Sequence, residues 1–132
     1  MSNKAEELVP ILMADDDAQD RMLTEKALRK TRLLNPLYFV RDGMELMDFL
    51  KCRGAYAEPG KAPRPGLIFL DLNMPKLDGR EALGEIKSDA NLRRIPIVVL
   101  TTSKAEEDVV RTYDLGVNSY ITKPVTFQGL VD

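Results

Sequence analysis

Five short apolar runs that alternate with stretches of helical periodicity limit the fold of this chain more than any other feature. The runs cover residues 8–14, 37–40, 66–70, 95–100 and 119–122. The helical stretches cover residues 18–30, 44–51, 79–87 and 104–115. Near-continuous hydrophobicity is typical of strands buried on both faces of a parallel sheet. With right-handed crossovers, this alternation predicts a doubly wound α/β fold with a five-stranded parallel sheet in the flavodoxin-like order 2-1-3-4-5.

Two segments depart from the regular alternation. Residues 53–66 are rich in glycine and proline and predict a long loop before the third strand. Near the C-terminus, Phe127, Leu130 and Val131 begin a fifth helix that stops after about two turns, so we expect a shortened last helix. With 132 residues, the chain is expected to form a single domain over residues 1–132, without an output domain.

Composition excludes several classes of function. The net charge of −2, without a basic stripe, disfavours nucleic-acid binding, and no apolar run is long enough to cross a membrane. The N-terminus lacks an apolar signal core and the single cysteine, Cys52, cannot form an internal disulfide, so we expect a cytoplasmic protein. The absence of histidine excludes catalytic triads and common zinc sites. Carboxylates, lysine and hydroxyls must therefore carry any chemistry.

Polar residues stand at the ends of four of the expected strands. Asp15 and Asp16 follow the first strand, Asp71 the third, Thr101 the fourth and Lys123 the fifth. The carboxyl ends of parallel strands meet at one edge of a sheet, where this fold class binds its ligands. We therefore expect these five side chains to share one crevice.

Carboxylates gathered in a crevice repel one another unless a cation joins them. All-oxygen ligands suit Mg²⁺, with Mn²⁺ as a substitute, and magnesium usually keeps positions open for water or phosphate. Lys123 and Thr101 offer a positive charge and a hydroxyl donor for the oxygens of a phosphoryl group. The pattern therefore predicts that Asp71 attacks a phosphoryl group and keeps it as an aspartyl phosphate.

Each of these features also has an ordinary structural explanation. Residues 15–17 can form an N-cap cluster for the following helix, and Asp71 can cap a helix or turn. Thr101 can be a plain N-cap, and Lys123 can be a solvated surface residue. The joint occurrence at four strand ends favours the functional interpretation.

These residues resemble the receiver domain of response regulators in bacterial two-component signalling, and the resemblance covers nearly the whole chain. The matching motifs are the Asp15-Asp16 pair, "DLNMPKLDG" with Asp71, "LTTS" with Thr101 and "YITKP" with Lys123. The resemblance implies Mg²⁺ bound by Asp16, Asp71 and the backbone carbonyl of Asn73, with Asp15 assisting directly or through water.

The resemblance also implies roles around the phosphoryl group. Lys123 and Thr101 would contact it, and the Lys123–Pro124 peptide bond would be cis. Tyr120 would act as a switch that turns inward when Thr101 moves toward the phosphoryl group. The surface around residues 104–115 and the fourth and fifth strands would then change for partner binding or relay.

The family implies a donor and partners for this chain. A histidine kinase would phosphorylate Asp71, and the domain would assist its own phosphorylation and slow dephosphorylation without being a turnover enzyme. "GEIKSDANLRRIPIVVLTTS" and residues 53–66 are similar to single-domain regulators paired with bacterial and cyanobacterial phytochromes. Those relatives imply a homodimer through residues 104–115, the fifth strand and the last helix, and a downstream protein target or phosphotransfer protein.

One position departs from the family pattern, and the residues argue against two of three rival classes. Thr102 stands where the family often has alanine, which would narrow access to the phosphoryl group. A haloacid-dehalogenase-type phosphatase needs an aspartate at the position of Asn73, which cannot titrate. A flavodoxin-like cofactor protein needs a phosphate loop where this chain has "DDDAQD", which repels phosphate without a cation. A receiver that binds partners without being phosphorylated is the remaining alternative.

Overall fold

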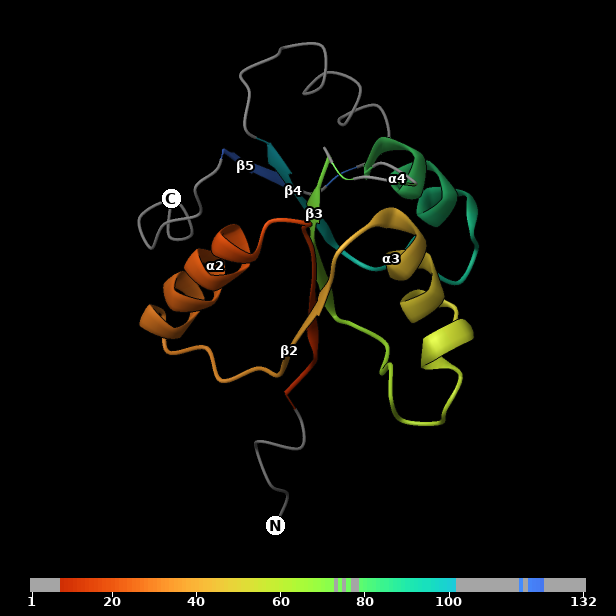
Figure 1. Cartoon of the computed structure of the whole chain (residues 1–132), viewed down its shortest axis with the longest axis horizontal. Helices are drawn as coiled ribbons and strands as arrows, with labels where there is room; N and C mark the ends of the chain where they lie inside the picture. Colours follow the sequence, from red (N-terminus) through yellow and green to blue (C-terminus); the bar gives the residue numbers. More distant parts are fainter. Residues whose placement is uncertain are drawn as a thin grey trace.

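The computed structural model describes residues 8–72, 74, 76, 79–101, 117 and 119–122, with the backbone alone for Thr101 and residues 119–122. In Figure 1, a twisted central sheet lies between helix α2 on one side and helices α3 and α4 on the other. The expected helix over residues 104–115 and the expected shortened last helix lie outside the described residues. Within the described part of the chain, no helix is long and apolar enough to cross a membrane.

The sheet has five parallel strands in the order β2-β1-β3-β4-β5, which confirms the predicted doubly wound, flavodoxin-like topology. The strands are β1 (Ile11–Ala14), β2 (Leu37–Val40), β3 (Leu67–Asp71), β4 (Ile97–Thr101) and β5 (Ser119–Thr122). β1 begins after Pro10 and β4 begins after Pro96, each two or three residues later than its apolar run. Proline has no N–H for the strand ladder, so both prolines mark the boundary.

The α-helices among the described residues are α2 (Ala18–Lys30), α3 (Gly43–Leu50) and α4 (Gly79–Ser88). They cover the two faces of the sheet, and alternate residues of each strand point to opposite faces. On β1, Leu12 and Ala14 belong to the core shared with α3 and α4, whereas Ile11 and Met13 belong to the core shared with α2. Burial on both faces explains why the strands read as continuous apolar runs.

The expected loop over residues 53–66 contains a short 3-10 helix, η1 (Gly54–Tyr56). The Tyr56 ring packs edge-on against Phe49 of α3, with ring centroids 5.1 Å apart. Further along, Ala62 is buried in the core that α3 and α4 share. The loop is therefore anchored to α3 by its own side chains, while Cys52 at its start is exposed.

Candidate metal centre at the carboxyl edge of the sheet

Three carboxylates converge where the two central strands end. Asp15 and Asp16 follow β1, and Asp71 is the last residue of β3, which pairs directly with β1. One carboxylate oxygen from each residue lies within 4.8 Å of the other two. The sequence separates Asp71 from the acid pair widely, and the parallel pairing of β1 with β3 brings them together. The predicted convergence of these three residues is therefore what the structure shows.

The three carboxylates differ in exposure. Asp15 and Asp71 are buried, with 0% and 2% of their surface exposed, whereas Asp16 is exposed. Two buried carboxylates and one at the rim give an all-oxygen donor set that opens to solvent on one side. Mg²⁺ and Mn²⁺ prefer hard oxygen ligands, and magnesium usually takes few protein carboxylates and keeps its remaining positions for other oxygens. The residues present fit such a cation.

Local hydrogen bonds fix the turn between β1 and α2. The Asp15 carboxylate accepts a hydrogen bond from the Asp17 backbone N–H at 2.9 Å. The Arg21 guanidinium donates to the Asp15 carbonyl oxygen at 2.7 Å. Asp17 turns to the helix instead, where its Oδ1 accepts from Gln19 N at 2.8 Å and Asp20 N at 3.2 Å. The N-cap explanation of this acidic run therefore holds for Asp17, and the two acids before it are left to the centre.

Gly79, at the start of α4, lies directly against the backbone at the end of β3. Its N–H donates to the Leu72 carbonyl oxygen at 3.1 Å. A side-chain carbon on Gly79 would lie 2.5 Å from Leu72 Cα and would also overlap with the Asp71 carbonyl group. Only glycine allows α4 to start this close to the end of β3. We did not single out this residue from the sequence, although the "DG" dipeptide before a helical stretch is a signal of a constrained turn.

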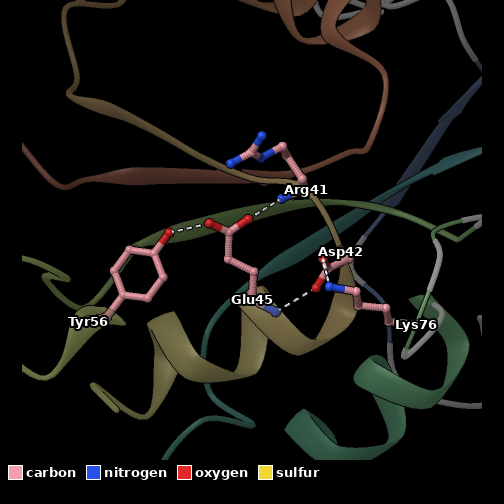
Figure 2. A network of polar contacts seen from close by, with 5 residues as sticks. All are labelled: Arg41, Asp42, Glu45, Tyr56 and Lys76. Carbon is pink, nitrogen blue, oxygen red and sulfur yellow. Dashed lines mark hydrogen bonds and ion pairs between the residues drawn. The ribbon is translucent and has the colours of Figure 1, made fainter. Parts of the chain in front are cut away.

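An open groove of about 510 Å³ adjoins the centre at Asp16. Its wall includes the first turn of α3, the η1 segment and Lys76. Figure 2 shows the polar network in this wall, in which Glu45 accepts hydrogen bonds from the Tyr56 hydroxyl at 2.6 Å and the Arg41 backbone N–H at 2.7 Å. Burial and the hydrogen bond to Glu45 raise the pKa of Tyr56 to about 12.

The sequence interpretation missed the groove residues Glu45 and Tyr56. The signal for Glu45 was the spacing Asp42-x-x-Glu45, which is related to the capping box. Asp42 does cap α3, because its Oδ1 accepts from Glu45 N at 2.8 Å. No sequence signal marks the contact from Tyr56, since it depends on how the loop folds back over α3.

Of the other predicted site residues, the structure describes the backbone of two, Thr101 and Tyr120. Thr101 ends β4, one residue beyond the pairing of Asp71 with Leu100, so its backbone lies at the same edge of the sheet as the acidic centre. Tyr120 lies in β5 and pairs with Val99. Asn73, Lys123 and Pro124 lie outside the described residues, as does Thr102. Their predicted roles stay predictions.

The fold and the acidic centre together define a class of protein. The sequence model of the family "Response regulator receiver domain" matches residues 11–132, and the chain belongs to this family. It is therefore a receiver-domain response regulator of two-component phosphorelay signalling. This assignment agrees with the local sequence, which argues against the phosphatase and cofactor-binding classes.

A cyanobacterial response regulator is similar to this chain over most of its length. Response regulator Rcp1 of Synechocystis is 46% identical over 123 residues, which cover 93% of this chain and 82% of Rcp1. The structure of the Mn²⁺-bound form of Rcp1 superposes with a TM-score of 0.80 at 47% identity, covering 87% of this chain and 81% of that chain.

Two further solved structures are similar over most of their length. The phosphorylated cyanobacterial phytochrome response regulator RcpA has a TM-score of 0.82 at 48% identity, covering 93% of this chain and 86% of that chain. The bacteriophytochrome response regulator AtBRR has a TM-score of 0.84 at 44% identity, covering 94% of this chain and 88% of that chain. This chain is thus similar to regulators of phytochrome-linked signalling.

Proposed function

We propose that this chain is a phosphoacceptor response regulator in which Asp71 receives a phosphoryl group from a histidine kinase in the presence of a divalent cation. The observation that carries the proposal is the convergence of Asp15, Asp16 and Asp71, with one oxygen of each within 4.8 Å of the others. Two of these carboxylates are buried, and a buried cluster of like charges is costly unless a cation balances it.

The carboxylates of Asp15, Asp16 and Asp71 would hold the cation, and the backbone carbonyl of Asn73 is proposed as a further ligand. We propose Mg²⁺ as the resident ion with Mn²⁺ as a substitute, supported by the Mn²⁺-bound form of Rcp1. When bound, the cation supplies positive charge that neutralises phosphoryl oxygens. The exposed position of Asp16 leaves this edge of the centre accessible to a donor.

Asp71 acts as the nucleophile in this proposal. One of its carboxylate oxygens forms a bond to phosphorus while the bond between phosphorus and the imidazole nitrogen of the kinase phosphohistidine breaks in line. The electron pair of the broken bond stays with the imidazole, and the product is an acyl phosphate on Asp71. The phosphorylated form of RcpA supports covalent phosphorylation in a close relative. The domain thereby assists its own modification and a slow dephosphorylation, and does not act as a turnover enzyme.

Lys123 and Thr101 are proposed to contact the phosphoryl oxygens. The backbone of Thr101 lies at the same edge of the sheet as the acidic centre, which supports this role. Tyr120 is the proposed switch residue, and Lys123–Pro124 the proposed cis peptide bond. The surface around β4, β5 and residues 104–115 would respond to phosphorylation through a shift between two conformations.

The proposed kinase partner is a phytochrome, supported by the phytochrome response regulators among the relatives. A homodimer through residues 104–115, β5 and the last helix is proposed by the same resemblance, as is a downstream protein target or phosphotransfer protein. We place the protein in the cytoplasm, where the exposed thiol of Cys52 suits the reducing environment.

Covalent labelling tests this function. The chain is incubated with acetyl phosphate and Mg²⁺, and the mass of the intact protein is measured. We expect one phosphoryl adduct on the parent chain and none on Asp71→Asn, because the nucleophile is lost. Asp17→Asn is the matched control, since it removes a neighbouring charge while asparagine still caps α2. An unchanged adduct on Asp71→Asn would refute the assignment.

A further inference from the structure

Lys76 is linked to the first turn of α3 through Asp42, as Figure 2 shows. Its ammonium nitrogen lies 3.6 Å from Asp42 Oδ2. The other carboxylate oxygen of Asp42 accepts the hydrogen bond from Glu45 N at 2.8 Å. One side chain therefore caps the helix with one oxygen and pairs with the segment that follows Asp71 with the other.

The Asp42 end of this contact is fixed. The Asp42 side chain is only 16% exposed, and Glu45 of the same turn is held by Tyr56 and by the Arg41 backbone. The next turn of α3 is buried in the core through Leu46 and other residues. Asp42 thus offers a negative charge at a defined place on a rigid element.

The Lys76 end of the contact belongs to the segment between β3 and α4. Met74 in this segment is 6% exposed and packs in the core, whereas the Lys76 side chain is 68% exposed. The backbone of Lys76 has a φ of 60°, a left-handed conformation that costs free energy for a residue with a side chain. A contact that holds Lys76 in place can offset that cost.

Lys76 and Asp42 also stand next to the acidic centre. Both line the same open groove as Asp16, the exposed carboxylate of the centre. The ion pair therefore joins the segment after Asp71 to the N-cap of α3 in the wall of the groove that adjoins the proposed cation site. No step of the proposed phosphoryl transfer uses either residue.

We propose that Lys76 is a positioning residue, whose ion pair with Asp42 holds the segment after Asp71 in the arrangement that takes up the divalent cation. The inference rests on the proposed function, because it concerns the affinity of that same centre. Lys76 touches neither the cation nor the phosphoryl group in this role. It acts through Asp42, so the effect of each residue depends on the presence of the other.

A double-mutant cycle tests this role. The dissociation constants of Mg²⁺ and Mn²⁺ are measured by titration calorimetry for the parent chain, Lys76→Met, Asp42→Asn and the double variant. Asparagine keeps the N-cap acceptor for Glu45 N and removes the charge that faces Lys76. We expect a coupling factor of about 1.5 to 5 between the two positions, the range that an exposed ion pair of up to about 1 kcal/mol provides.

The double-mutant cycle distinguishes a positioning role of the ion pair from a direct electrostatic effect of the two charges on the cation. If the two charges act on the cation only through their electric fields, loss of Lys76 would tighten cation binding and loss of Asp42 would weaken it. The two changes in the dissociation constant would then multiply in the double variant. Positioning instead makes the second substitution nearly silent once the first has broken the pair. Lys76→Arg should restore the parent affinity. Lys26→Met, which removes an exposed charge on α2, is the matched control and should show no coupling to Asp42→Asn.

A coupling factor of one within error, or a failure of Lys76→Arg to restore affinity, overturns the inference. Labelling of Asp71 by acetyl phosphate at saturating Mg²⁺ is measured on the same variants and should stay at the parent extent. If the parent chain is labelled and the coupling factor is one, the proposed function stands and the positioning role fails. If Asp71→Asn is labelled like the parent, the proposed function itself fails.

Discussion

Gly79 lies so close to the backbone of Asp71 that a methyl group on Gly79 would overlap with the Asp71 carbonyl group. The neighbouring atoms belong to the backbone of Asp71, at the end of β3, and of Leu72, and they cannot move aside as a side chain would. Forcing extra atoms into such a site costs about 1–3 kcal/mol. Gly79→Ala should therefore lower the free energy of unfolding by about that amount, as measured by urea denaturation.

Gly84, on the same helix, is the matched control for this prediction. A side-chain carbon there meets nothing within 4 Å. Alanine at a compatible helical position stabilises by about 0.4–1 kcal/mol. Opposite signs for the two substitutions are expected, and equal stability of Gly79→Ala and the parent chain would contradict the close approach to Asp71.

Asp16 should lower the stability of the cation-free fold and contribute to cation binding. Without a divalent ion, Asp16→Asn is expected to be at least as stable as the parent chain, because one of three neighbouring carboxylates is neutralised. The parent chain should gain about 2.7 kcal/mol at a Mg²⁺ concentration of 100 times the dissociation constant, and EDTA should remove this gain. Thermal unfolding with and without Mg²⁺ measures both effects. A full Mg²⁺-dependent gain in Asp16→Asn would exclude this residue from the cation site.

Tyr56 should make stability sensitive to alkaline pH. Its pKa is raised to about 12 from an ordinary value of 10.0, so the protonated phenol is favoured in the folded state. This contribution is complete below a pH of about 10 and is lost as the pH rises through about 12. Tyr56→Phe should lower the free energy of unfolding by about 1 kcal/mol at neutral pH, because the hydrogen bond to Glu45 is lost.

Ultraviolet titration checks the tyrosine assignment. The parent chain has four tyrosines, and the phenol of Tyr56 should ionise near pH 12. That step should be missing in Tyr56→Phe. Glu45→Gln should move it toward lower pH, since the carboxylate charge no longer opposes ionisation. A late step that persists in Tyr56→Phe would assign the raised pKa to another residue.

Lys123 should couple phosphorylation to the change in conformation. In the proposed function, Lys123→Ala leaves Mg²⁺ affinity nearly unchanged, because the carboxylates hold the cation, but removes the positive charge that the phosphoryl group contacts. We expect the tyrosine fluorescence of the phosphorylated parent chain to change and that of the variant to stay constant. A normal response of the Tyr120 environment in Lys123→Ala would refute this role.

The sequence predicted the topology because the apolar runs have a simple cause. Strands such as β1 bury alternate residues against opposite helices, so they read as continuous hydrophobic segments. The convergence of Asp15, Asp16 and Asp71 followed from the same topology, since parallel strands end at one edge. The role of Lys123 was inferred from its place after the fifth strand, and the roles of Asn73 and Tyr120 came from the family resemblance. All three roles stay predictions.

The wall of the groove could not be predicted in the same way. The contacts of Tyr56 with Glu45 and Phe49 depend on how residues 53–66 fold back over α3, and glycine and proline specify only that the chain turns. The N-cap alternative covered residues 15–17 together, and the local sequence did not distinguish which of these acids forms the cap. The hydrogen bonds to Gln19 and Asp20 make that distinction, because they turn Asp17 toward the helix.

The direct pairing of β1 with β3 has a consequence for how the protein forms. The strand β2, the helices α2 and α3 and the short η1 separate the two strands in the sequence. Pairing between such distant segments slows folding. Until that pairing forms, Asp15 and Asp71 lie in distant segments of an unfolded chain and are not held close together. In the proposed function, the affinity for a divalent ion therefore arises only after β1 and β3 have paired. Ion uptake measured during refolding would report when this pairing forms.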